Sequence, residues 1–263
     1  MKVVLFCGGM GMRLREHVDA VPKPMVPIGY RPILWHVMKY YAHYGHKEFI
    51  LCLGYRGDVI KEYFKHYDET LTNDFVVRVG QGIEMLGRDT HDWHITLVDT
   101  GVKASVGRRL TAVRSFIGCD EIFLANYSDG LTDAPLDEMI RRFEASNCVA
   151  SFLAVRPNLS YHFVNLDGDE RIVSILDASE VGFRINGGFF VMRREVFDFI
   201  QPDEDLVPGP FRRMLEANRL LSFRHDGFWA SMDTFKDRQM LEALHERDEA
   251  PWEVWKGRGG SRP

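Results

Sequence analysis

Residues 2–27, KVVLFCGGMGMRLREHVDAVPKPMVP, decide the fold class of this 263-residue chain. Their first six residues form a short apolar run with β-branched side chains, which predicts a buried strand over residues 2–7. The run ends in glycines, at the place where open α/β sheets bind their ligands. Further along, prolines on both sides of Lys23 predict an extended backbone that presents this lysine stiffly. Together these features predict a polyphosphate site.

The two commonest phosphate-binding motifs do not account for these glycines. The P-loop requires a Lys-Ser or Lys-Thr pair after its glycines, and none follows here. The dinucleotide fingerprint requires a third glycine where Leu14 stands, and an acidic residue near the position of Arg31. An ordinary turn with exposed cations is the alternative, but Arg13 and Lys23 favour phosphate binding.

Length and composition limit the class of protein. Hydrophobic residues make up 45% of the chain and charged residues 27%, as in globular α/β proteins. The net charge of −5 argues against nucleic acid as a partner. We recognise no signal peptide and no membrane-spanning stretch, so no membrane partner is expected. The cysteines lie mostly in apolar runs, which predicts buried, reduced thiols and a cytoplasmic location; they are Cys7, Cys52, Cys119 and Cys148.

Strand and helix patterns alternate along the first half of the chain. They predict strands over 48–53, 75–79, 94–98 and 121–125, and helices over 31–45, 58–66 and 105–116. This spacing predicts a mostly parallel sheet flanked by helices. The second half predicts strands over 149–155 and 185–192, a hairpin over 161–175 that turns at 167–168, and helices over 194–200, 210–218 and up to 246. We expect a single domain over residues 1–256 and a disordered tail over 257–263.

Two aspartates are candidate metal ligands. Asp129 follows an apolar strand and precedes Gly130, where a parallel sheet displays ligands, although an Asx turn is an alternative. Asp233 precedes a predicted helix, where aspartate also serves as an N-cap. The residues by themselves leave both roles open.

A series of motifs resembles those of the sugar-1-phosphate nucleotidyltransferases, and within them the glucose-1-phosphate cytidylyltransferase branch. In order these are GGxGxRL at 8–14, PKPM at 22–25, PILWH at 32–36, LVDTG at 97–101, the pair Asp129-Gly130, INGGFF at 185–190 and GFW with MDT at 227–234. The resemblance covers nearly the whole chain. It implies a mixed Rossmann-like sheet, Mg²⁺ as cofactor, and a homo-oligomer. The implied reaction condenses CTP with a sugar 1-phosphate to give a CDP-sugar and pyrophosphate.

The same resemblance implies a role for individual residues. Arg13, on the leaving pyrophosphate, and Lys23, near the reacting phosphorus, would be catalytic. Asp129 and Asp233 would hold the metal. The nucleotide would be bound by Gly8, Gly9, Gly11, Met12, Arg13, Lys23, Thr100, Arg109 and Ser128. Asn186 and Gly187 would line the sugar pocket.

One motif of the family is missing here. Its members hold the sugar's phosphate with the lysine of a Glu-Lys-Pro motif just before INGGFF. The corresponding stretch at 175–181 reads ILDASEV, and no lysine occurs between Lys103 and Lys236. A dianionic acceptor needs a cation, so we predict that Arg184 binds the acceptor phosphate. The alternatives are another nucleotide, a different phosphorylated acceptor, or a nucleotide sensor without turnover.

Overall fold

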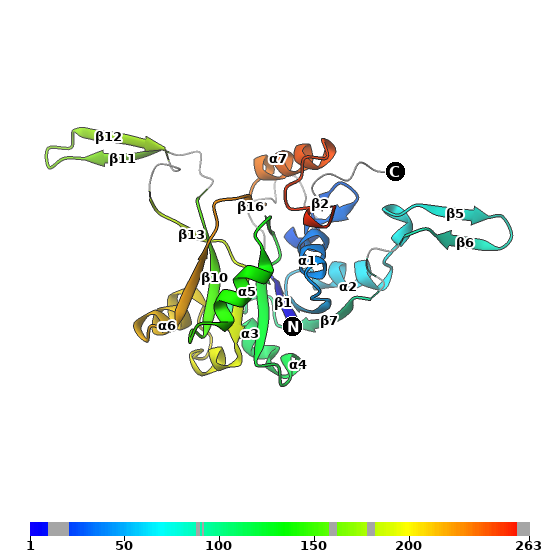
Figure 1. The fold of residues 1–263 in the computed structure, drawn as a ribbon, viewed down its shortest axis with the longest axis horizontal. Helices are drawn as coiled ribbons and strands as arrows, with labels where there is room; N and C mark the ends of the chain where they lie inside the picture. The colour runs from blue at the N-terminus through cyan, green and yellow to red at the C-terminus, as the bar shows by residue number, and fades with distance from the viewer. Residues whose placement is uncertain (10–20, 88–89, 91, 158–161, 178–181, 257–263) are drawn as a thin grey trace.

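The computed structural model describes residues 1–9, 21–87, 90, 92–157, 162–177 and 182–256. Its centre is a mixed, mostly parallel eight-stranded sheet flanked by helices, as the sequence predicts (Figure 1). The strands of this sheet are β1 (Lys2–Cys7), β4 (Glu48–Leu53), β7 (His94–Asp99), β8 (Ile122–Tyr127), β10 (Ala150–Val155), β13 (Ile185–Asn186), β14 (Phe190–Arg193) and β15 (Leu220–Arg224). They lie in the order β13-β10-β14-β8-β1-β4-β7, and β15 also pairs with β10.

The strand directions bring many strand ends to one edge of the sheet. β1 pairs in parallel with β4 and β8, and β4 pairs in parallel with β7. β14 is antiparallel to both β8 and β10, and β15 is parallel to β10. β10 and β15 therefore run in the same direction as β8, and the carboxyl ends of all these parallel strands meet at the same edge.

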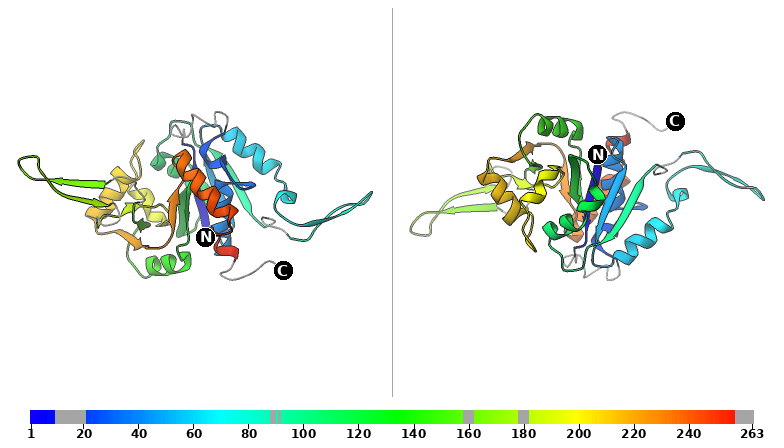
Figure 2. Two further views of the ribbon diagram at one scale, coloured as in Figure 1. Left: turned by 90° about the horizontal axis from the view of Figure 1, so that it is seen from above. Right: turned by 90° about the horizontal axis from the view of Figure 1, so that it is seen from below.

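Helices cover both faces of the sheet (Figure 2). They are α1 (Ile33–His43), α2 (Gly57–Lys65), α3 (Val106–Ala112), α4 (Arg114–Ile117), α5 (Leu136–Glu144), α6 (Arg212–Glu216) and α7 (Phe235–Glu246). Alternate residues of β1 point to opposite faces. Leu5 belongs to the core cluster that contains α1 residues such as Leu34, whereas Phe6 belongs to the cluster that contains Leu110 of α3. We call the second side the α3 face of the sheet.

Short elements complete the fold. The small two-stranded pairs are β2 (Pro27–Ile28) with β3 (Arg31–Pro32), β5 (Phe75–Arg78) with β6 (Gly82–Met85), β9 (Gly130–Thr132) with β16 (Trp229–Ser231), and β11 (His162–Leu166) with β12 (Ile172–Asp177). The 3₁₀ turns are η2 (Lys23–Met25), η3 (Glu69–Leu71), η4 (Arg194–Asp198) and η6 (Val254–Lys256), and η5 (Val207–Phe211) is a π-turn. Within the described residues, no helix is both long and apolar enough to cross a bilayer.

Two hairpins project from opposite ends of the body (Figure 1). The hairpin β11–β12 confirms the one predicted from the sequence, and its turn is held by Asp167, whose Oδ1 accepts hydrogen bonds from two backbone amides. The strand predicted over 75–79 is β5, but it pairs with β6 in the other hairpin rather than with the central sheet. Its apolar alternation is therefore exposed, and Val79 next to it is 95% exposed.

Several predicted elements differ from those observed. Lys23 was expected in extended backbone, but the amide of Met25 donates to the carbonyl of Pro22 and closes a 3₁₀ turn around the lysine. The strand predicted over 185–192 is broken at Gly188, which has a φ of +78°. The helix predicted over 105–116 divides at Val113 into α3 and α4. Cys119 lies in the turn after α4 and is exposed, unlike the other three cysteines.

The predicted helices of the second half are also shorter than expected. Residues 194–198 form the 3₁₀ turn η4, and the segment predicted over 210–218 begins within η5, where Pro210 has no backbone N–H to donate. The tail predicted over 257–263 lies outside the described residues.

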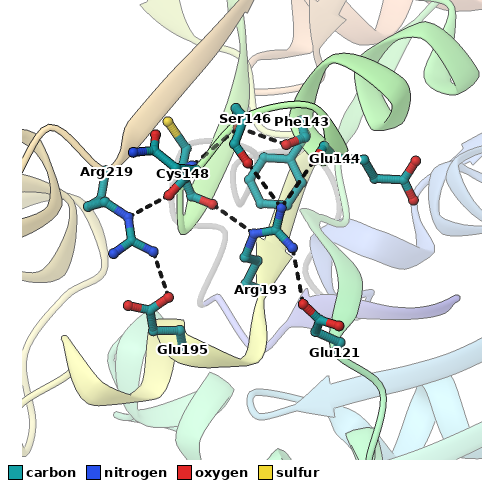
Figure 3. Close-up of polar contacts among 9 residues, drawn as sticks. Glu121, Phe143, Glu144, Ser146, Cys148, Arg193, Glu195 and Arg219 are labelled. Atoms are coloured by element: carbon teal, nitrogen blue, oxygen red, sulfur yellow. Dashed lines mark hydrogen bonds and ion pairs between the residues drawn. The ribbon is translucent and has the colours of Figure 1, made fainter.

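Two arginines tie the irregular second half to the sheet (Figure 3). Arg193, at the end of β14, donates to the carbonyls of Ser146 and Cys148 at 3.1 and 3.2 Å, in the turn between α5 and β10. Arg219 donates to the carbonyl of Asn147 in the same turn and pairs with Glu195 at 2.7 Å. These bonds satisfy carbonyls that follow the end of α5. They also connect the end of β14 to the turn that precedes β10.

Candidate active site

Lys23, Asp129 and Asp233 meet at the carboxyl edge of the sheet. The Nζ atom of Lys23 forms ion pairs with Oδ2 of Asp129 and, at 2.7 Å, with Oδ1 of Asp233. The three residues come from η2, from the turn after β8 and from the turn before α7. The sequence named all three as site residues, and the structure brings them together.

Pairing between β9 and β16 places the two aspartates side by side. Gly130 pairs with Ser231, and the amide of Met232 donates to the carbonyl of Asp129 at 3.0 Å. The Ser231 hydroxyl donates to Oδ2 of Asp233 at 2.6 Å, which orients that carboxylate. Thr234, not Asp233, caps α7, so the N-cap alternative for Asp233 is wrong.

The charges of this cluster depend on one another. Burial by itself would lower the pKa of the Lys23 ammonium, but the carboxylates of Asp129 and Asp233 outweigh burial and raise it above its ordinary value. Lys23 is therefore a permanent cation between two acidic side chains. Both contacting carboxylate oxygens lie within 2.7 Å of the same nitrogen, so they are no more than twice that distance apart.

A cleft of about 530 Å³ opens beside this cluster. It is lined by Gly8 and Gly9 after β1, by the loop between β7 and α3, by Tyr127 at the end of β8, and by Ser128 and Asp129 after it. Of the residues predicted to bind nucleotide, its lining contains Gly8, Gly9, Lys23, Arg109 and Ser128. The Ser128 hydroxyl donates to the carbonyl of Phe6 at 2.9 Å and joins the ends of β8 and β1.

Arg109 forms the floor of the cleft. Its guanidinium donates to the carbonyls of Gly8, Leu53 and Val102 and to the hydroxyl of Thr100, at 2.7–3.3 Å. A Cβ on Gly8 would lie 2.0 Å from this guanidinium, whereas a Cβ on Gly9 would meet nothing within 4 Å. Gly8 is therefore required for packing against Arg109, while Gly9 leaves the cleft open.

Asn186 and Gly187 lie on the other side of Tyr127. Gly188, which follows this pair, lies against Tyr127, because a Cβ on Gly188 would lie 3.1 Å from the Tyr127 ring. Burial raises the pKa of Tyr127 to about 12. The indole of Trp229 donates to the carbonyl of Gly187 at 2.8 Å, and a Cβ on Gly187 would lie 2.9 Å from that indole nitrogen. This close approach explains the glycine. The segment predicted as the sugar pocket is therefore adjacent to the cleft.

Arg184 lies beyond this segment. Its guanidinium donates to the carbonyls of Ala154 and His225 at 3.2 and 2.9 Å and pairs with Asp226. The described lining of the cleft does not include Arg184. Its role as ligand of the acceptor phosphate stays a prediction. Gly11, Met12 and Arg13 lie outside the described residues, and their roles stay predictions as well.

Lys103, Tyr127 and Asp205 also line the cleft and were not identified from the sequence. Lys103 follows the turn at Gly101, whose φ is +92°. Its position just after the motif LVDTG is the sequence feature from which Lys103 could have been identified. Asp205 comes from a segment far along the chain, which is held to the start of α3 by the hydrogen bond from Ser105 to the carbonyl of Glu204 and by the ion pair of Arg108 with Asp203.

The fold and the site together define a Rossmann-like α/β protein with a cationic and carboxylate-bearing cleft at the carboxyl edge of its sheet. The chain belongs to the nucleotidyl transferase family, which matches residues 2–236. This confirms the resemblance seen in the sequence.

Known relatives cover nearly the whole chain. It is 37% identical over 256 residues to a glucose-1-phosphate cytidylyltransferase of Salmonella typhi, covering 97% of this chain and 100% of the relative. It is 27% identical over 247 residues to a mannose-1-phosphate guanyltransferase of Yarrowia lipolytica, covering 90% of this chain and 62% of the relative. The crystal structure of HddC from Yersinia pseudotuberculosis matches with a TM-score of 0.64 at 18% identity, over 93% of this chain and 99% of that one, which supports the fold.

Proposed function

We propose that this protein transfers a cytidylyl group from CTP to a sugar 1-phosphate, giving a CDP-sugar and pyrophosphate. The observation that carries the proposal is the cluster of Lys23, Asp129 and Asp233 beside an open cleft. The likeness to a named cytidylyltransferase over 97% of the chain supports the choice of substrates.

The chemistry requires positioning and charge neutralisation rather than a protein nucleophile. An oxygen of the sugar phosphate, already an anion, forms a bond to the α-phosphorus of CTP. The bond from that phosphorus to the bridging oxygen breaks, and its electron pair leaves with pyrophosphate. Two like charges 4 Å apart repel by about 4 kcal/mol at an effective dielectric of 20. Each uncompensated pair would slow the reaction roughly a thousandfold, so the Lys23 ammonium has a direct role beside the reacting phosphates.

Asp129 and Asp233 would hold Mg²⁺. Their carboxylates offer the hard oxygen ligands that this ion prefers, and Mg²⁺ is commonly bound by one or two carboxylates together with substrate phosphates and water. Among the described residues there is no group of three or more acidic, histidine or cysteine side chains that could hold a metal, which suits such a sparse site. When bound, the ion supplies positive charge to phosphate oxygens. The Lys23 ammonium between the carboxylates would then turn toward a phosphate.

The nucleotide would enter over Gly9, where the backbone is open. Arg109 and Thr100 would shape the floor under it, because both are held by the carbonyl of Leu53. Lys103 would add a cation from the loop after β7. Arg13 is proposed on the leaving pyrophosphate.

The proposal includes a homo-oligomer and a cytoplasmic location. The projecting hairpins expose apolar side chains that copies of the chain could cover, among them Val77, Val79, Ile83 and Val173. Light scattering on the purified protein measures the assembly, and a monomer across the micromolar range would contradict it. Free buried cysteines suit a reducing compartment.

The test is pyrophosphate release with CTP and a panel of sugar 1-phosphates, with Mg²⁺ or with EDTA. We expect turnover with CTP that EDTA abolishes. The second candidate is transfer from another nucleotide, which the likeness to a guanyltransferase motivates. GTP, UTP and dTTP are therefore tested in parallel. Faster pyrophosphate release with any of them would show that this nucleotide, and not CTP, is the substrate. Nucleotide binding without release from any pair would favour the sensor alternative.

A further inference from the structure

Three arginines converge on one carboxylate next to the sugar segment. Oδ1 of Asp226 accepts from Nη2 of Arg184 at 2.5 Å and from Nε of Arg156 at 3.2 Å, and Oδ2 accepts from Nε of Arg224 at 2.9 Å. Arg156 directly follows β10, Arg184 directly precedes β13, and Arg224 ends β15. Segments far apart in sequence thus build one arginine cluster, which we define as Arg156, Arg184 and Arg224.

The strand register places this cluster on the same side of the sheet as the nucleotide cleft. Ala154 pairs with Asn186 of β13 and with Arg224 of β15, and directly paired residues share a face. Ala150, on the same face of β10 as Ala154, belongs to the core cluster of the α3 face, as does Tyr127 through its packing. Arg156 lies two residues after Ala154, and Arg184 lies two residues before Asn186. The cluster therefore continues the α3 face at the edge where the cleft opens.

A continuous path joins the cleft to the cluster. Tyr127 lines the cleft, a Cβ on Gly188 would lie 3.1 Å from its ring, and Arg184 stands four residues before Gly188. β10, at the centre of the cluster, lies two strands from β8. Two strand spacings are roughly 10 Å. In the proposed reaction the 1-phosphate of the acceptor lies beside Asp129, at the near end of this path, and the cluster then faces the far end of the sugar.

The three arginines differ in exposure and therefore in what they can do. Arg184 is only 21% exposed and is anchored on the carbonyls of Ala154 and His225. Arg156 and Arg224 are 55% and 67% exposed, so their guanidinium groups can meet an incoming ligand. Arg184 and Arg224 already bring two positive charges to the single carboxylate of Asp226. The hydrogen bond from Arg184, together with Arg224, holds the pKa of Asp226 well below its usual range, so it stays ionised and organises the group.

We propose that Arg156 and Arg224 bind a second anionic group of the acceptor, on the side of the sugar remote from its 1-phosphate. Arg184 and Asp226 position these two side chains. The inference rests on the proposed cytidylyl transfer and names its acceptor class: a sugar 1-phosphate that also carries a carboxylate or a second phosphate. Guanidinium groups bind either anion with paired N–H donors. This replaces Arg184 as a ligand of the 1-phosphate, because its N–H groups are directed to backbone carbonyls and to Asp226.

The experiment compares kcat/KM for CTP with glucose 1-phosphate, glucuronate 1-phosphate and glucose 1,6-bisphosphate. We expect the wild type to prefer one of the two acidic acceptors by about tenfold or more, the usual scale for a charge-assisted hydrogen bond. Comparison of glucuronate 1-phosphate with glucose 1,6-bisphosphate shows whether the second anionic group is a carboxylate or a phosphate. Arg156→Ala combined with Arg224→Ala should remove most of this preference, and the two lysine replacements should restore part of it.

Arg142→Ala is the matched control, because Arg142 is another exposed arginine, 61% exposed, that pairs with Glu138 on α5. It should keep the preference. Asp226→Asn removes the carboxylate that positions Arg156 and Arg224 and should weaken the preference for the acidic acceptor. A purely structural role would instead lower the melting temperature and slow all acceptors by the same factor.

A wild type that turns over glucose 1-phosphate at least as well as both acidic acceptors would overturn the inference and leave the proposed function intact. An unchanged preference in the double variant would overturn it too. Absence of pyrophosphate release from CTP with any acceptor would instead contradict the proposed function. Calorimetric binding of glucuronate 1-phosphate and of glucose 1,6-bisphosphate to the wild type and the double variant then decides the inference: affinity for one of them that the double variant loses supports it, and no such loss refutes it.

Discussion

Two adjacent glycines should respond in opposite ways to the same substitution. In Gly8→Ala the new Cβ would lie 2.0 Å from the Arg109 guanidinium, so this buried group must move. In Gly9→Ala the new Cβ would meet nothing within 4 Å. Neither glycine has a φ in the left-handed region, so backbone strain does not enter the comparison.

The expected size of the effect follows from the hydrogen bonds of Arg109. Its guanidinium donates to three carbonyls and one hydroxyl, and hydrogen bonds of charged groups contribute about 1.5–3 kcal/mol each. Loss of two of them lowers the free energy of unfolding of Gly8→Ala by about 3–6 kcal/mol. For a protein of this size that corresponds to a fall in Tm on the order of 10 °C. Gly9→Ala should change the free energy of unfolding by less than about 0.5 kcal/mol.

Thermal unfolding and kinetics together test this reasoning. Gly9→Ala should raise KM for CTP at unchanged Tm, because its methyl group enters the cleft. Arg109→Ala combined with Gly8→Ala should be little less stable than Arg109→Ala alone, because both changes remove the same bonds. A Tm of Gly8→Ala within 1–2 °C of the wild type would refute the assignment of Gly8 to packing against Arg109.

Asp233→Ala should remove most turnover at saturating Mg²⁺, and a kcat close to that of the wild type would show that Asp233 is not a metal ligand. Lys103→Ala should raise KM for CTP several-fold, the scale of one charged contact near the surface, while the exposed Lys61→Ala should not; equal values in both variants would exclude Lys103 from the nucleotide site. The hydrogen bond to Glu253 raises the pKa of His245. The contribution of His245 to the stability of the fold is therefore complete below its ordinary pKa of 6.5 and is lost as the pH rises through its pKa in the folded protein. Burial by itself would raise the pKa of Glu253, but its contacts with His245 and a lysine lower it. The contribution of Glu253 to the stability of the fold is therefore complete above its ordinary pKa of 4.5 and is lost as the pH falls through its pKa in the folded protein. The pair therefore contributes most to stability between about pH 4.5 and 6.5, and the difference in Tm between the wild type and His245→Gln should shrink above pH 6.5; a difference that does not change with pH would contradict the pairing.

Much of the site could be identified from the sequence because its parts are short and continuous. The run over residues 2–7 and the glycines after it place a ligand-binding turn at the end of a buried strand. Lys23, Asp129 and Asp233 were identified by their motifs, and the structure confirms that they meet. The fold class followed from the alternation of strands and helices, since parallel strands need helical crossovers. Local pattern predicted the strand β5 but not its place in the fold, because β5 pairs with the adjacent β6 in a hairpin outside the main sheet.

The sequence by itself determined the alternation of strands and helices in the first half and the absence of a lysine before INGGFF, and its family motifs identified the cations and carboxylates of the site. Each of these is read from short continuous stretches of sequence, which need no knowledge of distant contacts. Only the tertiary structure showed that Gly8 packs against the guanidinium of Arg109 and that Lys103 and Asp205 line the cleft. It alone showed that Arg156, Arg184 and Arg224 surround Asp226. Each of these depends on which strands pair and in which register, because a shift of one residue would turn the same side chains to the opposite face of the sheet.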